Sequence, residues 1–265
     1  MLLTLQRMGP GRYVLYAITA IAVFYLLLPI VFIPILSFNA SRWLEFPPPG
    51  WTLRWYEQLF TEEQWIGSIW NSVKVAFLVT ASAIVLALPA AFVLVRGKFL
   101  GKTALNAFFA SPMIVPVVII AVALYGFALQ WGMAGTLFAF VISHLILALP
   151  FAIISIGSSL QTFDIAYEKS AMICGASRVQ ALLHVTLPSI RPGIIAGALF
   201  AFLISWDEVV LAIFMATPSL QTLPVKIWVT LRTDLSPVIA AASSLLIGMS
   251  VLLLGISALI KRTRK

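Results

Sequence analysis

Six long apolar stretches constrain this 265-residue sequence more than any other feature. The apolar layer of a bilayer is roughly 30 Å thick, so a helix needs about 20 apolar residues to cross it. Backbone polar groups must be bonded internally in lipid, which leaves helices or closed barrels, and these stretches lack the alternation of barrel strands. The sequence therefore predicts an all-α membrane protein, a single transmembrane domain over residues 1–265 with six spans. The spans are expected at about 13–37, 71–95, 104–129, 133–155, 193–216 and 236–260.

The few charged residues agree with a membrane location. Only 10% of the residues are charged, whereas soluble domains average about 25%. The net charge of +8 comes from Lys and Arg near the ends of the apolar stretches, a placement typical of membrane orientation and not of nucleic-acid binding. Most of the 17 Lys and Arg residues fall on the inner side if the N-terminus is inside. Because positively charged loops stay in the cytoplasm, both termini are predicted to be cytoplasmic.

A polar loop at about 156–192, between the fourth and fifth spans, has helical character of its own. Asp164 is a suitable N-cap for a helix that starts near Ile165. Apolar residues at helical spacing form one stripe, and Leu187-Pro188 is expected to end the helix. An amphipathic helix at the inner membrane face suits docking into a groove on a soluble partner, although a passive surface helix fits equally well. The stripe consists of Met172, Ala176, Val179 and Leu183.

Two adjacent carboxylates, Asp207 and Glu208, lie past the middle of the predicted fifth span. An ionisable residue within a membrane is costly and normally faces a cavity or a partner. The pair therefore indicates a recognition point for a cation, and the neighbouring Trp206 could add a cation–π face. The alternative is a pair that caps a helix or reaches the interface. His144, in the fourth span, is expected to hydrogen-bond a neighbouring helix.

Signals of enzyme chemistry are missing from the sequence. It contains no His, Cys and carboxylate set with metal-ligand spacing and no nucleophile with a matching base. Gly101-Lys102-Thr103 looks like the end of a phosphate-binding P-loop, but that motif needs a glycine where this sequence has Arg96. We therefore expect no cofactor in this chain and any ATP to be hydrolysed elsewhere.

The polar loop resembles the cytoplasmic signature of bacterial ABC importer permeases. That signature runs Glu-Ala-Ala, three residues, Gly, nine residues, an aliphatic residue, one residue and Leu-Pro. Here Gly175 and the Leu-Pro pair match, whereas Lys169 occupies the position of the signature Glu and Glu168 lies one residue earlier. The resemblance implies that these residues contact the ATPase: Glu168, Lys169, Ser170, Ala171, Gly175, Ala176, Val185, Leu187 and Pro188.

Further segments are similar to the second permease subunit of spermidine/putrescine importers: TLRWYEQLF, Asn71-Ser72, SPMIVPVVI, SWDEVVLAIFM and LPVKIW. This resemblance implies the fold of an ABC type I importer permease, with a cytoplasmic coupling helix between spans four and five, in a bacterial inner membrane. The implied partners are a second permease, two ATP-binding subunits that carry ATP and Mg²⁺, and an extracytoplasmic binding protein. It also implies a pathway that includes Trp206, Asp207 and Glu208 and carries polyamines. A phosphonate, opine or amino-acid-like solute is the alternative, followed by a secondary transporter or a membrane scaffold.

Overall fold

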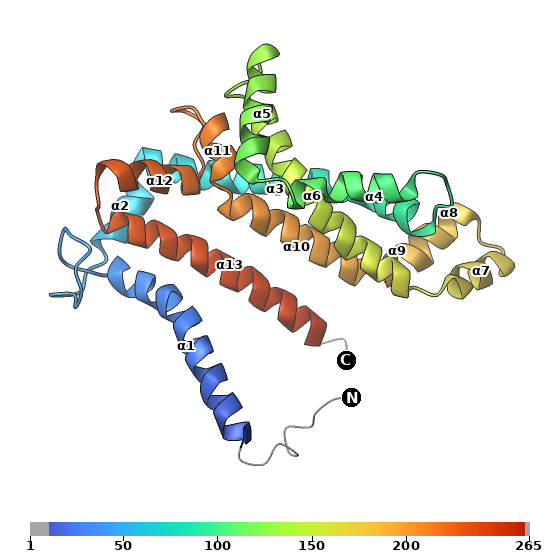
Figure 1. Cartoon of the computed structure of the whole chain (residues 1–265), viewed down its shortest axis with the longest axis horizontal. Coiled ribbons are helices and arrows are strands. Elements are labelled where there is room, and N and C mark those ends of the chain that lie inside the picture. Colours follow the sequence, from blue (N-terminus) through green and yellow to red (C-terminus); the bar gives the residue numbers. More distant parts are fainter. Residues whose placement is uncertain (1–10, 263–265) are drawn as a thin grey trace. The chain divides into compact units, whose positions relative to one another are not determined.

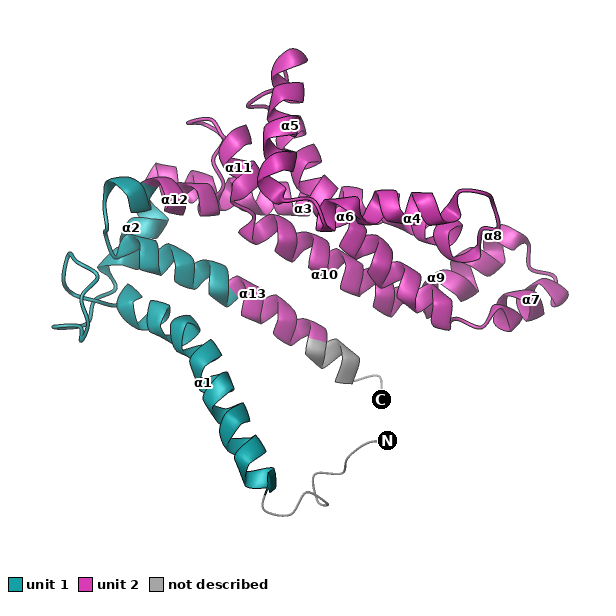
Figure 2. Ribbon diagram, in the orientation of Figure 1, with its two compact units in different colours: residues 1–61, 230–248 teal, residues 62–229, 249–265 magenta. Residues whose placement is uncertain are grey.

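The computed structural model describes residues 11–262 as helices joined by turns (Figure 1), with side chains described through residue 257. The chain divides into two compact units (Figure 2). Unit 1 consists of residues 1–61 and 230–248, and unit 2 of residues 62–229 and 249–265. Whether they act as one domain stays a prediction. The terminal Arg7, Arg264 and Lys265, which contributed to the predicted orientation, lie outside the described residues.

Unit 1 contains α1 (Gly11–Ser37), α2 (Arg54–Thr61) and the first part of α13 (Val238–Arg262). The connection between α1 and α2 is organised around the fully buried Asn39. The side-chain amide of Asn39 donates to the backbone carbonyls of Trp43 and Glu45, and the backbone carbonyl of Asn39 accepts from the Trp55 indole N–H at 2.6 Å. A polar residue in this position fixes the loop because its buried hydrogen-bonding groups are satisfied.

Unit 2 is built on three helices, α3 (Glu63–Arg96), α6 (Leu137–Thr162) and α10 (Arg191–Asp207), each of which packs against the other two. The buried face of α3 repeats every four residues, as one side of a helix requires. On α10, small residues allow close approach to α6, as transmembrane helix packing favours. A Cβ on Gly193 would lie 2.3 Å from the Ser159 Cβ. The fully buried residues of the α3 face are Val75, Val79, Ala83, Ala87 and Ala91.

Among the described residues, four helices are long and apolar enough to cross a membrane: α1, α3, α6 and α13. Two bent pairs raise the number to as many as six. The predicted third span, 104–129, is wrong as one continuous helix. It consists of α4 (Lys102–Ala110), a 3-10 turn at Ser111–Met113 and α5 (Val117–Gln130), and the two arms are bent by 97°. Pro112 and Pro116 explain the break, because each lacks a backbone N–H and clashes with the preceding turn.

The predicted fifth span, 193–216, is also interrupted. Its helix α10 ends at Asp207, and a short helix, α11 (Val210–Met215), follows after a break at Glu208 and Val209. Beyond it, α12 (Leu223–Thr233) carries the chain to the last long helix. The span therefore ends at the acidic pair instead of passing through it.

Candidate functional site

The polar loop forms two helical segments, so the prediction of one continuous helix is wrong. The first is α7 (Ile165–Ile173), and the second comprises α8 (Arg178–Ala181), a π-helical turn at Leu182–Thr186 and α9 (Leu187–Ser189). We call residues 163–189 the coupling segment. The predicted cap is confirmed: Asp164 Oδ1 accepts from the backbone N–H of Ala166 at 2.8 Å.

Gly175 separates the two segments because α7 ends in a Schellman motif. The N–H of Gly175 donates to the carbonyl of Met172 at 3.1 Å, and the N–H of Ala176 donates to the carbonyl of Ala171 at 3.0 Å. This motif places the residue after the C-cap in the left-handed region, where glycine is favoured. Gly175 has φ +95°, and a Cβ there would meet nothing within 4 Å. The Ala-to-Gly spacing of the signature thus corresponds to one helix-ending turn, and backbone conformation accounts for the glycine.

The second segment begins at a capping box. Ser177 Oγ accepts from the N–H of Gln180, and the Gln180 side chain accepts from the N–H of Ser177. The helical structure ends at Ser189, one residue after the predicted Leu187-Pro188 stop, and α10 starts at Arg191 after a bend of 66°. The π-turn pairs the N–H of Leu187 with the carbonyl of Leu182, and its wider spacing accommodates a proline that has no N–H.

Glu168 links three parts of unit 2. Its Oε2 accepts from Arg96 Nη1 at the end of α3 and from Thr186 Oγ1 in the π-turn, both at 2.8 Å. The guanidinium also lies over the rings of Phe92 and Phe163, 5.1 and 5.7 Å from their centroids. Lys169, at the signature position, is exposed. The Glu168 carboxylate is therefore hydrogen-bonded within the chain.

The bonds to Glu168 also set its protonation. Burial alone would raise the pKa of this carboxyl group, but the hydrogen bonds from Thr186 and Arg96 and the Arg96 charge outweigh burial and lower it. Glu168 is therefore ionised at neutral pH and keeps its charge-assisted bonds, which are among the stronger hydrogen bonds in proteins.

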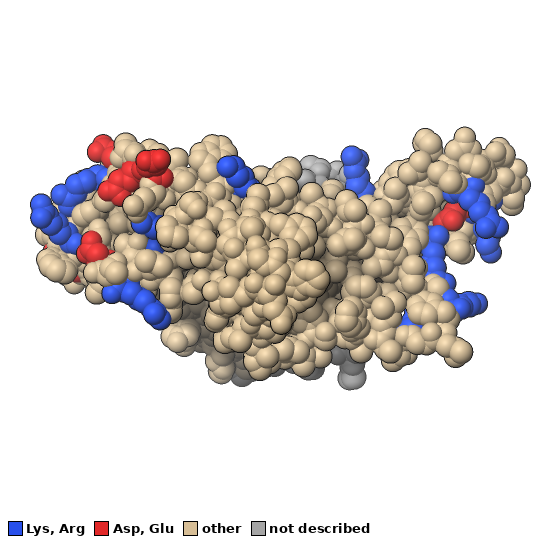
Figure 3. Space-filling model, turned by 90° about the horizontal axis from the view of Figure 1, so that it is seen from above, with Lys and Arg blue, Asp and Glu red and all other residues tan. Residues whose placement is uncertain are grey.

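The outer surface of the coupling segment is apolar with a basic surround. Ile173 is 87% exposed, and Val179 and Leu183 are also exposed, whereas Met172 and Ala176 of the predicted stripe are half-buried. Figure 3 shows basic side chains gathered at the end of unit 2 that carries α7 and α8. Of the other signature residues, Ser170 and Pro188 are exposed and Ala171, Val185 and Leu187 are half-buried.

The acidic pair separates into two environments. Asp207, the last residue of α10, is exposed, whereas Glu208 is 8% exposed. Glu208 Oε1 accepts from the N–H groups of Val210 and Leu211, and Oε2 accepts from Ala212, each at 3.0 Å. Glu208 thus caps the start of α11, the alternative that the sequence left open, while the Asp207 side chain stays exposed.

A buried polar contact joins α6 to this break. His144 is fully buried, and its Nδ1 lies 2.9 Å from Ser205 Oγ on α10, which confirms the predicted bond to a neighbouring helix. Its Nε2 lies 3.7 Å from Glu208 Oε2. Trp206 is 1% exposed, and its ring stacks on Phe202. The indole face that the sequence assigned to a cation therefore lies within the helix packing.

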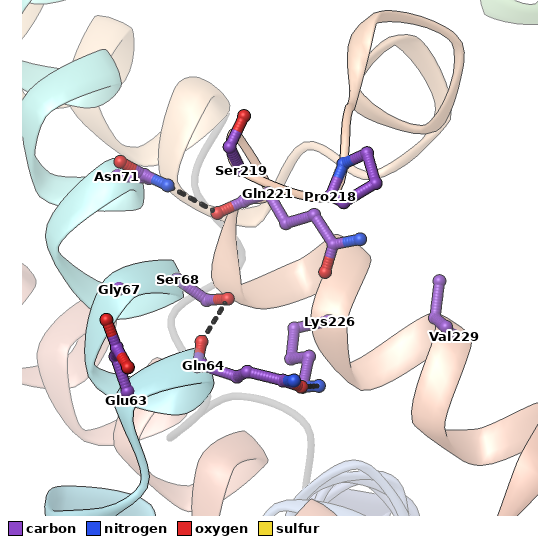
Figure 4. A pocket seen from close by; sticks show the side chains of 10 residues that line it. All are labelled: Glu63, Gln64, Gly67, Ser68, Asn71, Pro218, Ser219, Gln221, Lys226 and Val229. Carbon is purple, nitrogen blue, oxygen red and sulfur yellow. Dashed lines mark hydrogen bonds between the residues drawn. The ribbon is translucent and has the colours of Figure 1, made fainter.

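A polar cavity of about 540 Å³ lies at the other end of α3 (Figure 4). It is lined by the first turns of α3, the loop after α11 and α12. Asn71 Nδ2 donates to the Gln221 carbonyl across it at 3.1 Å, and Lys226 Nζ bonds the side chain of Gln64. Within the described part of the chain, no three His, Cys, Asp or Glu side chains gather as metal ligands do.

Sequence reasoning missed Arg96, Thr186 and Ser205. Arg96 and Glu168 are 72 residues apart, and His144 and Ser205 are 61 apart. No local sequence pattern predicts contacts between residues so far apart in the chain. A buried polar residue in an apolar run, as at His144, was the one available signal, because buried polar groups need a partner.

Comparison with known families decides what kind of protein carries this site. The family described as "Binding-protein-dependent transport system inner membrane component" matches residues 83–265. The chain belongs to this family. It is therefore a transmembrane permease of a binding-protein-dependent importer. The match covers the coupling segment, the acidic pair and the buried His144 contact.

Individual relatives agree with the family. The chain is 31% identical over 238 residues to the spermidine/putrescine transport system permease protein PotC of Haemophilus influenzae, covering 90% of this chain and 92% of the relative. It is 30% identical to the putrescine transport system permease protein PotI of Escherichia coli K12, covering 84% and 82%. At 29% it also resembles the sulfoquinovosyl glycerol transport system permease protein SmoH of Agrobacterium fabrum, covering 76% and 73%.

Solved structures show the same fold. A chain of a bacterial ABC transporter that imports the acidic polysaccharide alginate superposes with a TM-score of 0.68 at 15% identity, covering 95% of both chains. A chain of the MetNI methionine ABC transporter in inward-facing form gives 0.62 at 17% identity, covering 76% and 95%. The permease thus has the all-helical fold of ABC importer membrane subunits.

Proposed function

We propose that this permease is the second membrane subunit of an ATP-driven importer of polyamines. The similarity to PotC across 90% of the chain carries the proposal, because that relative is named for spermidine and putrescine. The exposed carboxylate of Asp207 at the end of α10 adds a chemical reason. An acid within a membrane protein attracts a cationic solute, and polyamines are cations at neutral pH.

The permease would work in a bacterial inner membrane with both termini in the cytoplasm. Its partners would be a second permease, two ATP-binding subunits and an extracytoplasmic binding protein. ATP and Mg²⁺ would be held by the ATP-binding subunits. An importer that includes a periplasmic binding protein is among the solved structures of this fold.

In this mechanism the coupling segment transmits the movement of the ATPase. Its exposed apolar residues would dock in a groove on the ATP-binding subunit. Because Glu168 bonds Arg96 on α3 and Thr186 in the π-turn, a displacement of α7 acts on α3 as well as on α6 and α10. These three helices form the core of unit 2, so their joint tilt would alternate the access of the pathway.

The predicted pathway residues Trp206, Asp207 and Glu208 receive different tasks in this proposal. Asp207 would meet the ammonium group of the solute. Glu208 would keep α11 in place through its three backbone bonds, and Trp206 would support the end of α10 by stacking on Phe202. Contact with Asp207 has to be weak, because a tightly held solute would not be released.

Uptake of labelled spermidine tests the proposal directly. The permease and its partner subunits would be expressed in cells that lack their own polyamine importers, and ATP-dependent uptake is expected. An ATPase variant that binds but does not hydrolyse ATP is the control. Uptake that persists with this variant, or an assembled and ATP-hydrolysing complex that takes up no polyamine, would refute the proposal.

A second candidate is a sugar-like solute. The 29% identity to SmoH, whose name refers to sulfoquinovosyl glycerol, favours it. The same assay separates the two, because excess unlabelled spermidine competes with a polyamine and not with a sugar.

A further inference from the structure

A second cavity, of about 400 Å³, opens between α3, α4 and α6. Its walls come from the last turns of α3, the first turns of α4 and the last turns of α6. Both α3 and α6 are long and apolar enough to cross a membrane, and the cavity lies at their C-terminal ends. The cavity is separate from the acidic pair and belongs to no step of the proposed transport mechanism.

The cavity has two chemical halves. Leu94 and Ile153, which are 7% and 6% exposed, form an apolar floor. The rim is polar and carries hydrogen-bond donors. It consists of Lys102, Asn106, Ser158 and Gln161.

The electrostatic surroundings favour an anion at the rim. Arg96, Lys98 and Lys102 lie at this end of α3, and the sequence from residue 64 to residue 163 contains no Asp or Glu. Glu168, which reaches this end of α3 from the coupling segment, is already bound to Arg96 and Thr186. A basic cavity at the cytoplasmic end of transmembrane helices is a common arrangement for anionic lipid headgroups.

We propose that the cavity binds an acidic phospholipid. The phosphate group would contact Lys102 and the polar rim, and an acyl chain would lie on the apolar floor. The charged part of the lipid then occupies the polar rim, and its apolar part occupies the floor. A soluble anion would leave the floor empty, and a zwitterionic lipid would bring no net negative charge to balance Lys102.

This site adjoins the link between α3 and α7. Lys102 Nζ donates to the carbonyls of Val95 and Gly97 at 3.2 and 3.1 Å, on either side of Arg96 in the sequence. Arg96 in turn holds Glu168. A lipid that engages Lys102 therefore stabilises the end of α3 to which the coupling segment is attached.

Lipid binding to the complete importer complex tests the inference and is independent of which solute is carried. The complex in mild detergent would be titrated with phosphatidylglycerol or phosphatidylcholine, and bound lipid counted by native mass spectrometry. One lysine at an anionic surface contributes ~1 kcal/mol, which corresponds to about a fivefold preference for phosphatidylglycerol. The preference is expected to disappear in Lys102→Gln.

Two further variants and one competitor complete the test. Lys102→Arg keeps the charge and should restore the preference. Lys98→Gln removes an exposed charge nearby that does not line the cavity, and should keep it. Glycerol phosphate, which lacks acyl chains, should not displace the lipid.

Three results would overturn the inference. They are equal retention of both lipids by the unsubstituted complex, an unchanged preference in Lys102→Gln, and displacement by glycerol phosphate. Crosslinking of the cavity residues to a partner subunit in place of lipid would likewise assign the cavity to a protein interface.

Discussion

Removing the charge at Arg96 should loosen α7 from the rest of the permease. Arg96→Met keeps an apolar stem over Phe92 and Phe163 but deletes the bond to Glu168. A hydrogen bond to a charged group contributes about 1.5–3 kcal/mol. Because the Arg96 and Glu168 side chains are 26% and 17% exposed, solvent screening places the effect near the lower limit, about 1.5 kcal/mol. This corresponds to about a tenfold increase in local opening.

Hydrogen exchange of the α7 amides in the assembled complex measures this opening. Protection over Ile165–Ile173 is expected to fall about tenfold in Arg96→Met and to stay unchanged in the control Lys98→Met. The double variant Arg96→Met/Glu168→Gln should lose little more than either single variant, because each single change already removes the charge-assisted interaction between Arg96 and Glu168. Equal protection in Arg96→Met and the control, or fully additive losses, would refute the link.

The same link predicts a pH dependence. The pKa of Glu168 is lowered in the folded chain, so its stabilising contribution is present above the ordinary Glu pKa and is lost as pH falls through the lowered value. Protection of α7, corrected for intrinsic exchange, should therefore hold through mildly acidic pH and fall below the ordinary value. In Arg96→Met the pKa of Glu168 is lowered less, so this loss of protection at acidic pH should be smaller. An identical pH profile in both proteins would contradict the cause assigned to the pKa shift.

The remaining substitutions test the other parts of the site and the core. Gly175→Ala forces a side chain into the left-handed region at a cost of about 1–2 kcal/mol and should weaken co-purification of the ATP-binding subunit. Gly175→Asn, which tolerates that region better, should weaken it less. If Gly175→Ala and the unsubstituted permease recover the same amount of ATP-binding subunit, the turn is not the reason for the glycine. Asp207→Asn should reduce polyamine uptake at least tenfold with the complex intact, and unchanged uptake would exclude a pathway role for Asp207. Glu208→Gln should mainly lower thermal stability, by about 1–3 kcal/mol, because it weakens the cap of α11. Gly193→Ala should lower the melting temperature in detergent, because its Cβ would overlap Ser159 and destabilise the fold by about 1–3 kcal/mol. Gly248→Ala, with open space around it, should not. Equal melting temperatures for the two variants would contradict the close packing at Gly193.

Local chemistry made part of the permease predictable. Apolar length indicated the long helices, and the Asp164 cap appeared where its side chain can reach a backbone N–H two residues on. The family resemblance rested on a spacing that the structure explains as a Schellman turn followed by a capped helix. Features decided within about four residues of sequence were therefore accessible.

Features decided by contacts between distant residues were not. Apolar periodicity joined Met172 to Leu183 as one stripe, although the backbone turns at Gly175. Likewise, hydropathy carried the fifth span through Glu208, since a window average cannot see that one carboxylate accepts three backbone bonds and starts a new helix. The partners Arg96 and Thr186 became visible only when the chain folded.

The bend at Ile190 gives the second half of the coupling segment the properties of a lever. Helical structure from Arg178 to Ser189 meets α10 at 66°. At about 1.5 Å per residue this arm is about 18 Å long. A rotation of about 10° at Ile190 would carry its far end about 3 Å, so a modest change in α10 corresponds to a displacement as large as an atom's width where the ATP-binding subunit would dock. The stiffness of the π-turn, and not only the affinity of the ATP-binding subunit for the coupling segment, would then determine how much of an ATPase movement reaches the membrane helices.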